Sequence, residues 1–263
     1  IQQRGVRFPL GPPKKMHKVA IIEKIHQDGI NLLKDNPAFE FEIIEDASEE
    51  NLIKVLPNFD ACTLRVSQLS EKILSKCKNL KVISRHGVGY DNVDLDYIKK
   101  NNISLLITAT ANAVAVAEHV ISMFLSISKS ISKYDEEVRK GNFKLNADKI
   151  QTFELLNKNI LIAGFGRIGK KLISRCLAFD AKVYIYDPYV DEKIIKEFGG
   201  IKVDKIEDGL KNADYVSLHM PLTNETKNLI NYSVFKNMKK NSIIINTARG
   251  GIINEPELEK ALN

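Results

Sequence analysis

The chain has 263 residues, of which 44% are hydrophobic and 27% are charged, a composition typical of a globular protein long enough for two domains. Its net charge is +6, and lysines and glutamates are interspersed along the chain. Because no arginine-rich arm or basic patch with aromatic residues is visible, the sequence argues against a nucleic-acid partner. No apolar run approaches the length of a membrane span, so we expect no membrane association.

The three cysteines, Cys62, Cys77 and Cys176, lie far apart and lack the CxxC spacing of a metal site. Their pattern argues against both disulfides and zinc, and it favours a reducing compartment. We therefore expect a cytoplasmic protein with no metal site.

Short apolar runs alternate with amphipathic segments along the chain. The apolar runs predict strands over 19–22, 39–44, 61–64, 80–84, 103–107, 160–163, 182–186, 215–218 and 243–246. Helical spacing and capping residues predict helices over 27–33, 48–56, 70–77, 95–100, 113–139, 168–179, 191–198, 206–212, 231–238 and from 254 onward. This alternation predicts an α/β fold with parallel sheets that are covered by helices on both faces.

The segment 113–139 is predicted to form one long helix at the boundary between two domains. Its first half is apolar nearly all round, so we expect it to be buried between domains or against a second subunit. We expect a first domain over 16–112, a linking helix over 113–140 and a second domain over 141–263. Residues 1–15 carry basic residues and prolines but no acid, and we expect a tag or a disordered extension.

A glycine-rich segment of the second domain is the most specific motif. The strand 160–163 leads into Gly164, Gly166 and Gly169, which satisfy G-x-G-x-x-G, and a predicted helix follows. The next strand ends on Asp187, eighteen residues after the last glycine. A glycine triplet alone is weak evidence, but a strand, a helix and an acid at this spacing together predict a dinucleotide site.

Each of these residues has a physical role in such a site. Gly164 permits the tight turn, Gly166 lets the backbone approach a pyrophosphate, and Gly169 lets the helix pack close to the sheet. The free N–H groups at the start of the helix then bind the phosphates. Asp187 would accept hydrogen bonds from the adenosine ribose and repel a 2′-phosphate, which favours NAD over NADP. The alternative is an ordinary glycine-rich turn between a strand and a helix.

Two further loops carry arginines where strands are predicted to end, which is where doubly wound sheets bind ligands. The loop 84–92 contains Arg85 and glycines whose N–H groups could hold a carboxylate, and Arg65 follows the preceding strand. The loop 246–251 contains Arg249, which could pair with a substrate carboxylate and polarise a carbonyl that is about to accept a hydride. For each loop, the alternative is a tight turn with a solvated arginine.

Several segments are distinctive in combination: G-F-G-R-I-G with Y-D-P, H-M-P-L-T, N-T-A-R-G-G-I, G-V-G-Y-D-N-V-D and A-N-A-V-A-V-A-E-H. Together they resemble the D-isomer-specific 2-hydroxyacid dehydrogenase family, over the chain from about Met16 to its end. Within the family the sequence is most similar to the D-3-phosphoglycerate dehydrogenase branch. The resemblance implies a Rossmann NAD-binding domain and a flavodoxin-like substrate domain, both doubly wound parallel sheets, in a homodimer.

The resemblance also implies a reaction. It is hydride transfer between NAD and C2 of a D-2-hydroxy acid or 2-keto acid, with 3-phosphoglycerate, a precursor of serine, as the leading substrate. Arg65 and Arg85 stand at the positions of two arginines that hold the substrate phosphate in that branch. The backbone of Val88 and Gly89 would grip the substrate carboxylate. Arg249 would be the catalytic arginine that holds the carboxylate and the keto oxygen.

Other positions of this sequence match residues that contact the cofactor in the family. They are Arg167, Ile168, His219, Pro221, Thr247 and Ala248. By resemblance, the first two would face the pyrophosphate, the next two would form the cofactor wall, and the last two would line the nicotinamide site.

One departure from the family pattern bears on catalysis. The family's general acid/base is a histidine in P-H-x-x-G, which a glutamate in D-V-F-x-x-E-P orients, and both normally follow A-R-G-G-I. None of the five histidines of this sequence stands in that motif. We therefore expect a C-terminally incomplete chain that carries Arg249 and the adenosine half-site but lacks the catalytic histidine and glutamate.

Three alternatives remain open at this point. A hydroxypyruvate or glyoxylate reductase would use the same fold and cofactor on a substrate without phosphate. A catalytically inactive, corepressor-like module would bind NAD without turnover. A relative of formate dehydrogenase would have no reason to keep Arg65 and Arg85.

Overall fold

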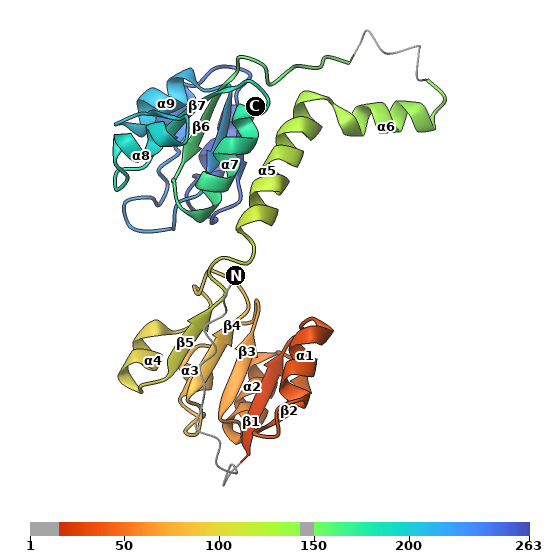
Figure 1. Cartoon of the computed structure of the whole chain (residues 1–263), viewed down its shortest axis with the longest axis vertical. Coiled ribbons are helices and arrows are strands. Elements are labelled where there is room, and N and C mark those ends of the chain that lie inside the picture. Colours follow the sequence, from red (N-terminus) through yellow and green to blue (C-terminus); the bar gives the residue numbers. More distant parts are fainter. Residues whose placement is uncertain (1–15, 143–149) are drawn as a thin grey trace. The chain divides into compact units, whose positions relative to one another are not determined.

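The computed structural model describes residues 16–142 and 150–263, which form two compact units, one ending at Ala111 and the other running from Asn112 to Asn263. Each unit contains a five-stranded parallel sheet with flanking helices (Figure 1). The expected extension at 1–15 lies outside the described residues.

The first unit has the strand order of a flavodoxin-like sheet, β2-β1-β3-β4-β5. Its strands are β1 (His17–Ile22), β2 (Phe39–Ile44), β3 (Ala61–Leu64), β4 (Val82–Arg85) and β5 (Ser104–Ile107). Its helices are α1 (Gln27–Lys34), α2 (Glu49–Val55), α3 (Glu71–Leu74) and α4 (Leu95–Lys100), with a 3₁₀ turn, η1 (Leu56–Asn58). Side-chain caps fix three helix starts of this unit: the His26 ring accepts from the Asp28 N–H, Ser48 accepts from the Asn51 N–H, and Asp94 accepts from the Tyr97 N–H.

The second unit has the Rossmann order, β10-β9-β6-β7-β8, in which the first strand along the chain is central. Its strands are β6 (Asn159–Ala163), β7 (Lys182–Tyr186), β8 (Ile201–Lys202), β9 (Tyr215–Leu218) and β10 (Ile243–Asn246). Its helices are α5 (Ala113–Ser128), α6 (Ile131–Arg139), α7 (Arg167–Leu177), α8 (Glu192–Glu197), α9 (Ile206–Asn212), α10 (Tyr232–Phe235) and α11 (Glu255–Leu262). The predicted fold class, two doubly wound parallel sheets, is confirmed. Among the described strands, only β8 escaped prediction, because two residues are too few to show a period.

Strand β6 shows why the second sheet is covered on both faces. Ile160 and Ile162 belong to the apolar core that also contains residues of α5 and α7. Leu161 and Ala163 belong to a separate core with residues of α9. Because successive side chains of a strand point to opposite faces, an uninterrupted apolar run supplies both cores.

The expectation of a single helix over 113–139 is wrong. Ser130 adopts a left-handed conformation with φ 50°, and α5 and α6 meet there at a bend of 59°. Helix α5 packs its buried residues, including Val120 and Phe124, against α7, whereas α6 buries no residue. The buried face of α5 ends at Ser128, just before the bend, and the apolar pattern does not reveal this end. Within the described residues, no single helix is long and apolar enough to cross a membrane.

Candidate functional site

The turn between β6 and α7 is shaped by its glycines. Gly164 has φ +101°, and a Cβ on it would lie 2.6 Å from the His219 carbonyl oxygen. A Cβ on Gly169 would collide with the Gly164 carbonyl oxygen, so α7 packs directly on the turn. A Cβ on Gly166 would meet no atom within 4 Å. Packing within the protein thus requires the first and third glycines, whereas the middle glycine faces open space of the kind that a pyrophosphate needs.

Asp187, at the end of β7, ties two loops together. Its carboxylate accepts hydrogen bonds from the Phe165 N–H at 2.8 Å and from the Tyr189 N–H at 2.9 Å. One oxygen takes each bond, so both oxygens keep lone pairs for further donors such as ribose hydroxyls. The residue predicted to contact the ribose therefore also fixes the glycine turn.

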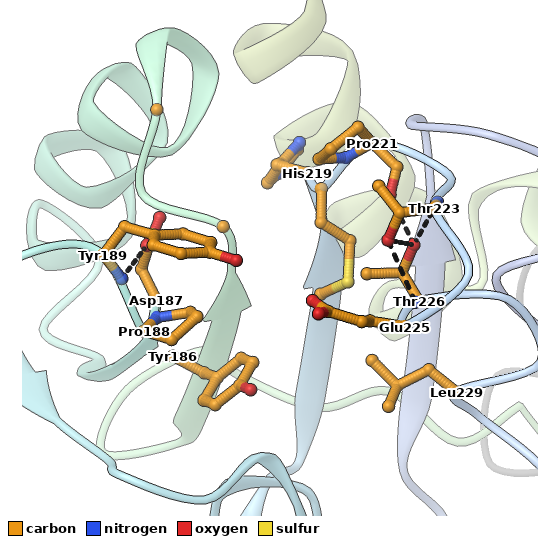
Figure 2. Close-up of a pocket in the computed structure, with 13 residues that line it drawn as sticks. Tyr186, Asp187, Pro188, Tyr189, His219, Pro221, Thr223, Glu225, Thr226 and Leu229 are labelled. Carbon is orange, nitrogen blue, oxygen red and sulfur yellow. Dashed lines mark hydrogen bonds between the residues drawn. The ribbon is translucent and has the colours of Figure 1, made fainter.

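A cavity of about 320 Å³ lies at the carboxyl ends of β6, β7 and β9. Between β6 and β9 the order of the strands reverses, which is where open α/β sheets bind ligands. Figure 2 shows two walls: residues at the end of β7 on one side, and His219 with the loop that follows β9 on the other. Five predicted cofactor residues line this cavity: Gly164, Gly166, Asp187, His219 and Pro221.

Sequence reasoning missed the remaining residues of the cavity. They are Tyr186, Pro188, Tyr189, Met220, Thr223, Glu225, Thr226 and Leu229. The Thr226 hydroxyl donates to the Pro221 carbonyl oxygen at 2.6 Å and accepts from the Thr223 N–H at 2.7 Å, which folds the loop into a tight turn (Figure 2). The segment T-N-E-T was a detectable signal, because threonine hydroxyls commonly bond nearby backbone groups in turns.

His219 is a half-buried histidine in the wall of the cavity. Its Nε2 atom lies 2.8 Å from the Ser217 hydroxyl, and its Nδ1 atom is buried without a hydrogen-bond partner in the described part of the chain. Burial lowers the pKa of His219 from 6.5 to about 4, so the ring is neutral at pH 7. An unsatisfied buried nitrogen beside the cavity fits a site that a bound molecule completes.

The other predicted cofactor residues stand outside the cavity lining. Arg167 and Ile168 begin α7, with the arginine exposed, and Gly169 is buried on the same helix. Thr247 and Ala248 follow β10, the neighbour of β9, and the predicted catalytic residue Arg249 comes directly after them.

The loop after β10 has a defined shape. The Asn246 side chain accepts from the Ala248 N–H at 3.0 Å and donates to the Arg249 carbonyl oxygen at 2.8 Å. The Arg249 guanidinium donates to the Ala248 carbonyl oxygen at 2.7 Å. The hydroxyl of Thr247 is buried without a partner among the described residues. Arg249 is therefore held at the carboxyl edge of the second sheet.

The four predicted substrate residues gather at the carboxyl edge of the first sheet. Arg85 ends β4 and pairs in register with Leu64, the last residue of the neighbouring strand β3, and Arg65 directly follows that strand. The Arg85 guanidinium bends across Gly87, where a Cβ would collide with it, and donates to the His86 carbonyl oxygen. In the described structure the N–H groups of Val88 and Gly89 have no hydrogen-bond partner, so they are available to an anion.

Across 16–142 and 150–263, no group of three or more His, Cys, Asp or Glu side chains could hold a metal ion.

The low pKa of His219 predicts a loss of stability in acid. Because the unfolded chain binds a proton near pH 6.5 and the folded chain only near pH 4, protonation favours unfolding between these values. His219 should contribute about 3 kcal/mol of stability above pH 6.5 that is lost as the pH falls to 4. Denaturant unfolding of wild type and His219→Gln from pH 7 to pH 4 measures this component. The exposed His119 supplies the control, His119→Gln, and equal pH slopes for wild type and His219→Gln would refute the prediction.

The glycine geometry predicts that two similar substitutions act differently. Gly166→Ala should leave the thermal midpoint nearly unchanged but weaken NAD binding at least about tenfold, because the methyl group enters the open space over the turn. Gly164→Ala should lower the thermal midpoint, because its φ of +101° and the nearby His219 carbonyl do not tolerate a Cβ. Calorimetric titration with NAD and thermal unfolding separate the two effects. Undiminished NAD affinity in Gly166→Ala would contradict the predicted role of this glycine.

Comparison with known proteins agrees with this geometry. Residues 121–263 match the family described as D-isomer specific 2-hydroxyacid dehydrogenase, NAD binding domain. The chain is 31% identical to D-3-phosphoglycerate dehydrogenase of Methanocaldococcus jannaschii over 248 residues, which cover 94% of this chain and 47% of that protein. It is 32% identical to hydroxypyruvate reductase of Thermotoga maritima over 243 residues, 92% of this chain and 77% of that protein.

A solved structure gives the same result. D-lactate dehydrogenase from Aquifex aeolicus, complexed with NAD and lactic acid, superposes with a TM-score of 0.79 at 32% identity and covers 93% of this chain and 73% of that one. The chain spans about half the length of the D-3-phosphoglycerate dehydrogenases that it matches.

The glycine turn, Asp187 and the family match identify NAD as the cofactor of the second unit. The chain belongs to the D-isomer-specific 2-hydroxyacid dehydrogenase family.

Proposed function

We propose that the protein of this chain transfers a hydride between NAD and C2 of a D-2-hydroxy acid, with 3-phosphoglycerate as the substrate. In this proposal the first unit is the substrate domain and the second unit is the NAD-binding domain. Support comes from the family match and from relatives named D-3-phosphoglycerate dehydrogenase at 31–33% identity.

One observation carries the choice of a phosphorylated substrate. Arg65 and Arg85 stand at the carboxyl ends of two hydrogen-bonded strands, offset by a single residue. A substrate that carries only one carboxylate is already matched by the free N–H groups of Val88 and Gly89. Two additional guanidinium groups at the same edge suit a second anionic group, and arginine is well suited to bind phosphate.

Each remaining site residue has a role in this chemistry. Bound NAD supplies or accepts the hydride at C2. Arg249 pairs with the substrate carboxylate and polarises the keto oxygen as negative charge develops on it. Thr247 and Ala248 line the nicotinamide site, the N–H groups of Arg167 and Ile168 hold the pyrophosphate, and Asp187 holds the ribose.

The C2 oxygen must also gain or lose a proton, and we do not assign that role to His219. His219 is the only histidine among the residues that line the cavity, and its pKa of about 4 leaves it unprotonated near neutral pH. A general acid works best when its pKa lies near the operating pH, so His219 is better suited to forming the cofactor wall together with Pro221.

Hydroxypyruvate is the second candidate substrate. The match to hydroxypyruvate reductase of Thermotoga maritima favours it, because this chain covers 77% of that protein. Hydroxypyruvate is the keto acid that 3-phosphoglycerate yields on oxidation, but without the phosphate. The phosphorylated substrate would need Arg65 and Arg85 for binding, whereas hydroxypyruvate would not.

We also propose a homodimer formed through the α5–α6 region. Helix α6 buries no residue in its own chain, and Ile127, Ile131 and Val138 are 50%, 51% and 52% exposed. Apolar side chains on adjoining helices form the kind of surface that a second copy can cover.

A reducing, cytoplasmic location completes the proposal. Cys62, Cys77 and Cys176 are free and buried. Burial raises the pKa of the Cys77 thiol to about 11 and that of Cys176 to about 12. Protonated, buried thiols are unreactive, so these three cysteines favour a reducing compartment in which they stay free.

The substrate is tested by Arg65→Ala in the intact protein. The KM for 3-phosphohydroxypyruvate should rise at least about tenfold, because the phosphate loses a charge-assisted partner, while the KM for hydroxypyruvate stays within about twofold. Steady-state NADH oxidation with both substrates measures the ratio of the two KM values. Lys99→Ala removes an exposed positive charge elsewhere in the first unit and serves as the control. Equal losses with both substrates would rule out a phosphate role for Arg65.

The dimer is tested by Ile131→Glu combined with Val138→Glu. Charged side chains on the proposed interface should shift the protein from dimer to monomer, because burying them is unfavourable. Sedimentation equilibrium measures the mass, and Leu32→Glu, at a 74% exposed site of the first unit, is the control. A monomeric wild type, or an unchanged dimer in the double variant, would contradict the proposal.

A further inference from the structure

Glu23 occupies an unusual place in the first unit. It directly follows β1, next to β3, at the point where the strand order β2-β1-β3 reverses. Its φ is 67°, in the left-handed region that glycine adopts more easily than glutamate. A non-glycine residue held in this conformation at a ligand-binding edge points to a function for its side chain.

The side chain of Glu23 binds two consecutive backbone N–H groups, one on each side of the Arg65 Cα atom. A single carboxylate oxygen, Oε2, accepts hydrogen bonds from the Arg65 N–H at 2.9 Å and from the Val66 N–H at 2.8 Å. The carbonyl oxygen of the next residue, Lys24, accepts from the Arg65 guanidinium at 3.0 Å. Residues 23 and 24 therefore hold both the main chain and the side chain of Arg65.

A second residue holds the same loop from the far side. The Asn92 amide donates to the Ser67 carbonyl oxygen at 2.7 Å and to the Arg65 carbonyl oxygen at 3.3 Å. Glu23 accepts from the N–H groups and Asn92 donates to the carbonyl groups, so two side chains distant in sequence fix the loop 65–67, which directly follows β3. The loop is otherwise exposed: Val66, beside Arg65, is 78% accessible.

We propose that Glu23 is a positioning residue that sets the substrate preference by holding Arg65 in place. This inference rests on the proposed function, in which Arg65 binds the phosphate of the substrate. The carboxylate fixes the chain where the Arg65 side chain begins, and the Lys24 carbonyl limits where the guanidinium can lie. Pre-organising a binding arginine in this way lowers the entropy that phosphate binding costs.

The test compares ligands that differ by one phosphate group. Calorimetric titration of the intact protein with 3-phosphoglycerate and with D-glycerate, in the presence of NADH, gives two dissociation constants for each variant. Glu23→Gly removes the carboxylate and also relieves the backbone strain, so any loss of affinity for 3-phosphoglycerate arises from removal of the side chain. We expect it to weaken 3-phosphoglycerate binding about tenfold and to leave D-glycerate binding within about twofold.

Two variants provide the controls. Glu23→Gln keeps an oxygen that can accept both N–H groups, so it should restore most of the affinity for 3-phosphoglycerate. Glu42→Gln changes an exposed glutamate on β2 and should match wild type. Because both ligands are titrated into the same preparation, an unfolded fraction changes the stoichiometry for both and leaves the ratio of dissociation constants intact.

Arg65→Ala, titrated in parallel, distinguishes a failure of the positioning role of Glu23 from a failure of the phosphate-binding role of Arg65. If Arg65→Ala loses the preference for 3-phosphoglycerate and Glu23→Gly keeps it, the positioning role is overturned while the proposed function stands. If Arg65→Ala affects both ligands equally, the phosphate role fails and the inference falls with it. Loss of the preference in both variants, with recovery in Glu23→Gln, supports the inference.

Discussion

The second unit depends on the alignment of three strand ends at Gly164. Ala163 lies in register between Tyr186 of β7 and Leu218 of β9. The Gly164 N–H donates to the Tyr186 carbonyl oxygen at 2.8 Å, and the His219 N–H donates to the Ala163 carbonyl oxygen at 2.7 Å. The absence of a side chain at residue 164 lets these strand ends meet, and both walls of the cavity follow from that contact.

Several candidate site residues also stabilise the fold. The Asp187 carboxylate holds the glycine turn through the Phe165 N–H before any ribose is present, so the site is largely pre-formed. His219 is kept neutral by burial and bonds Ser217 with one nitrogen, which leaves the other nitrogen unsatisfied at the wall. A pre-formed turn with an unsatisfied polar atom favours a cofactor that binds without rearranging the sheet.

In the first unit, too, intramolecular contacts hold the candidate ligand-binding side chains, here at the carboxyl edge of the first sheet. Arg65 and Arg85 reach neighbouring positions because β3 and β4 are parallel and in register. Neither arginine is free to move as a simple surface side chain: the Arg65 guanidinium bonds the Lys24 carbonyl, and the Arg85 guanidinium bends over Gly87. In the proposed function, these two side chains would select the substrate, and the hydrogen bonds that hold them would limit where its phosphate can bind.

The sequence by itself determined every described strand except β8, most helices, the family and the cofactor NAD, because periodicity, caps and the spacing from Gly164 to Asp187 are local signals. Three features required the tertiary structure. The bend at Ser130 depends on where the core under α5 ends, the wall from Thr223 to Leu229 depends on a loop folding back beside β9, and the Glu23–Arg65 contact joins residues 42 positions apart. Each is set by contacts between segments distant in sequence, and local patterns carry no information about such contacts.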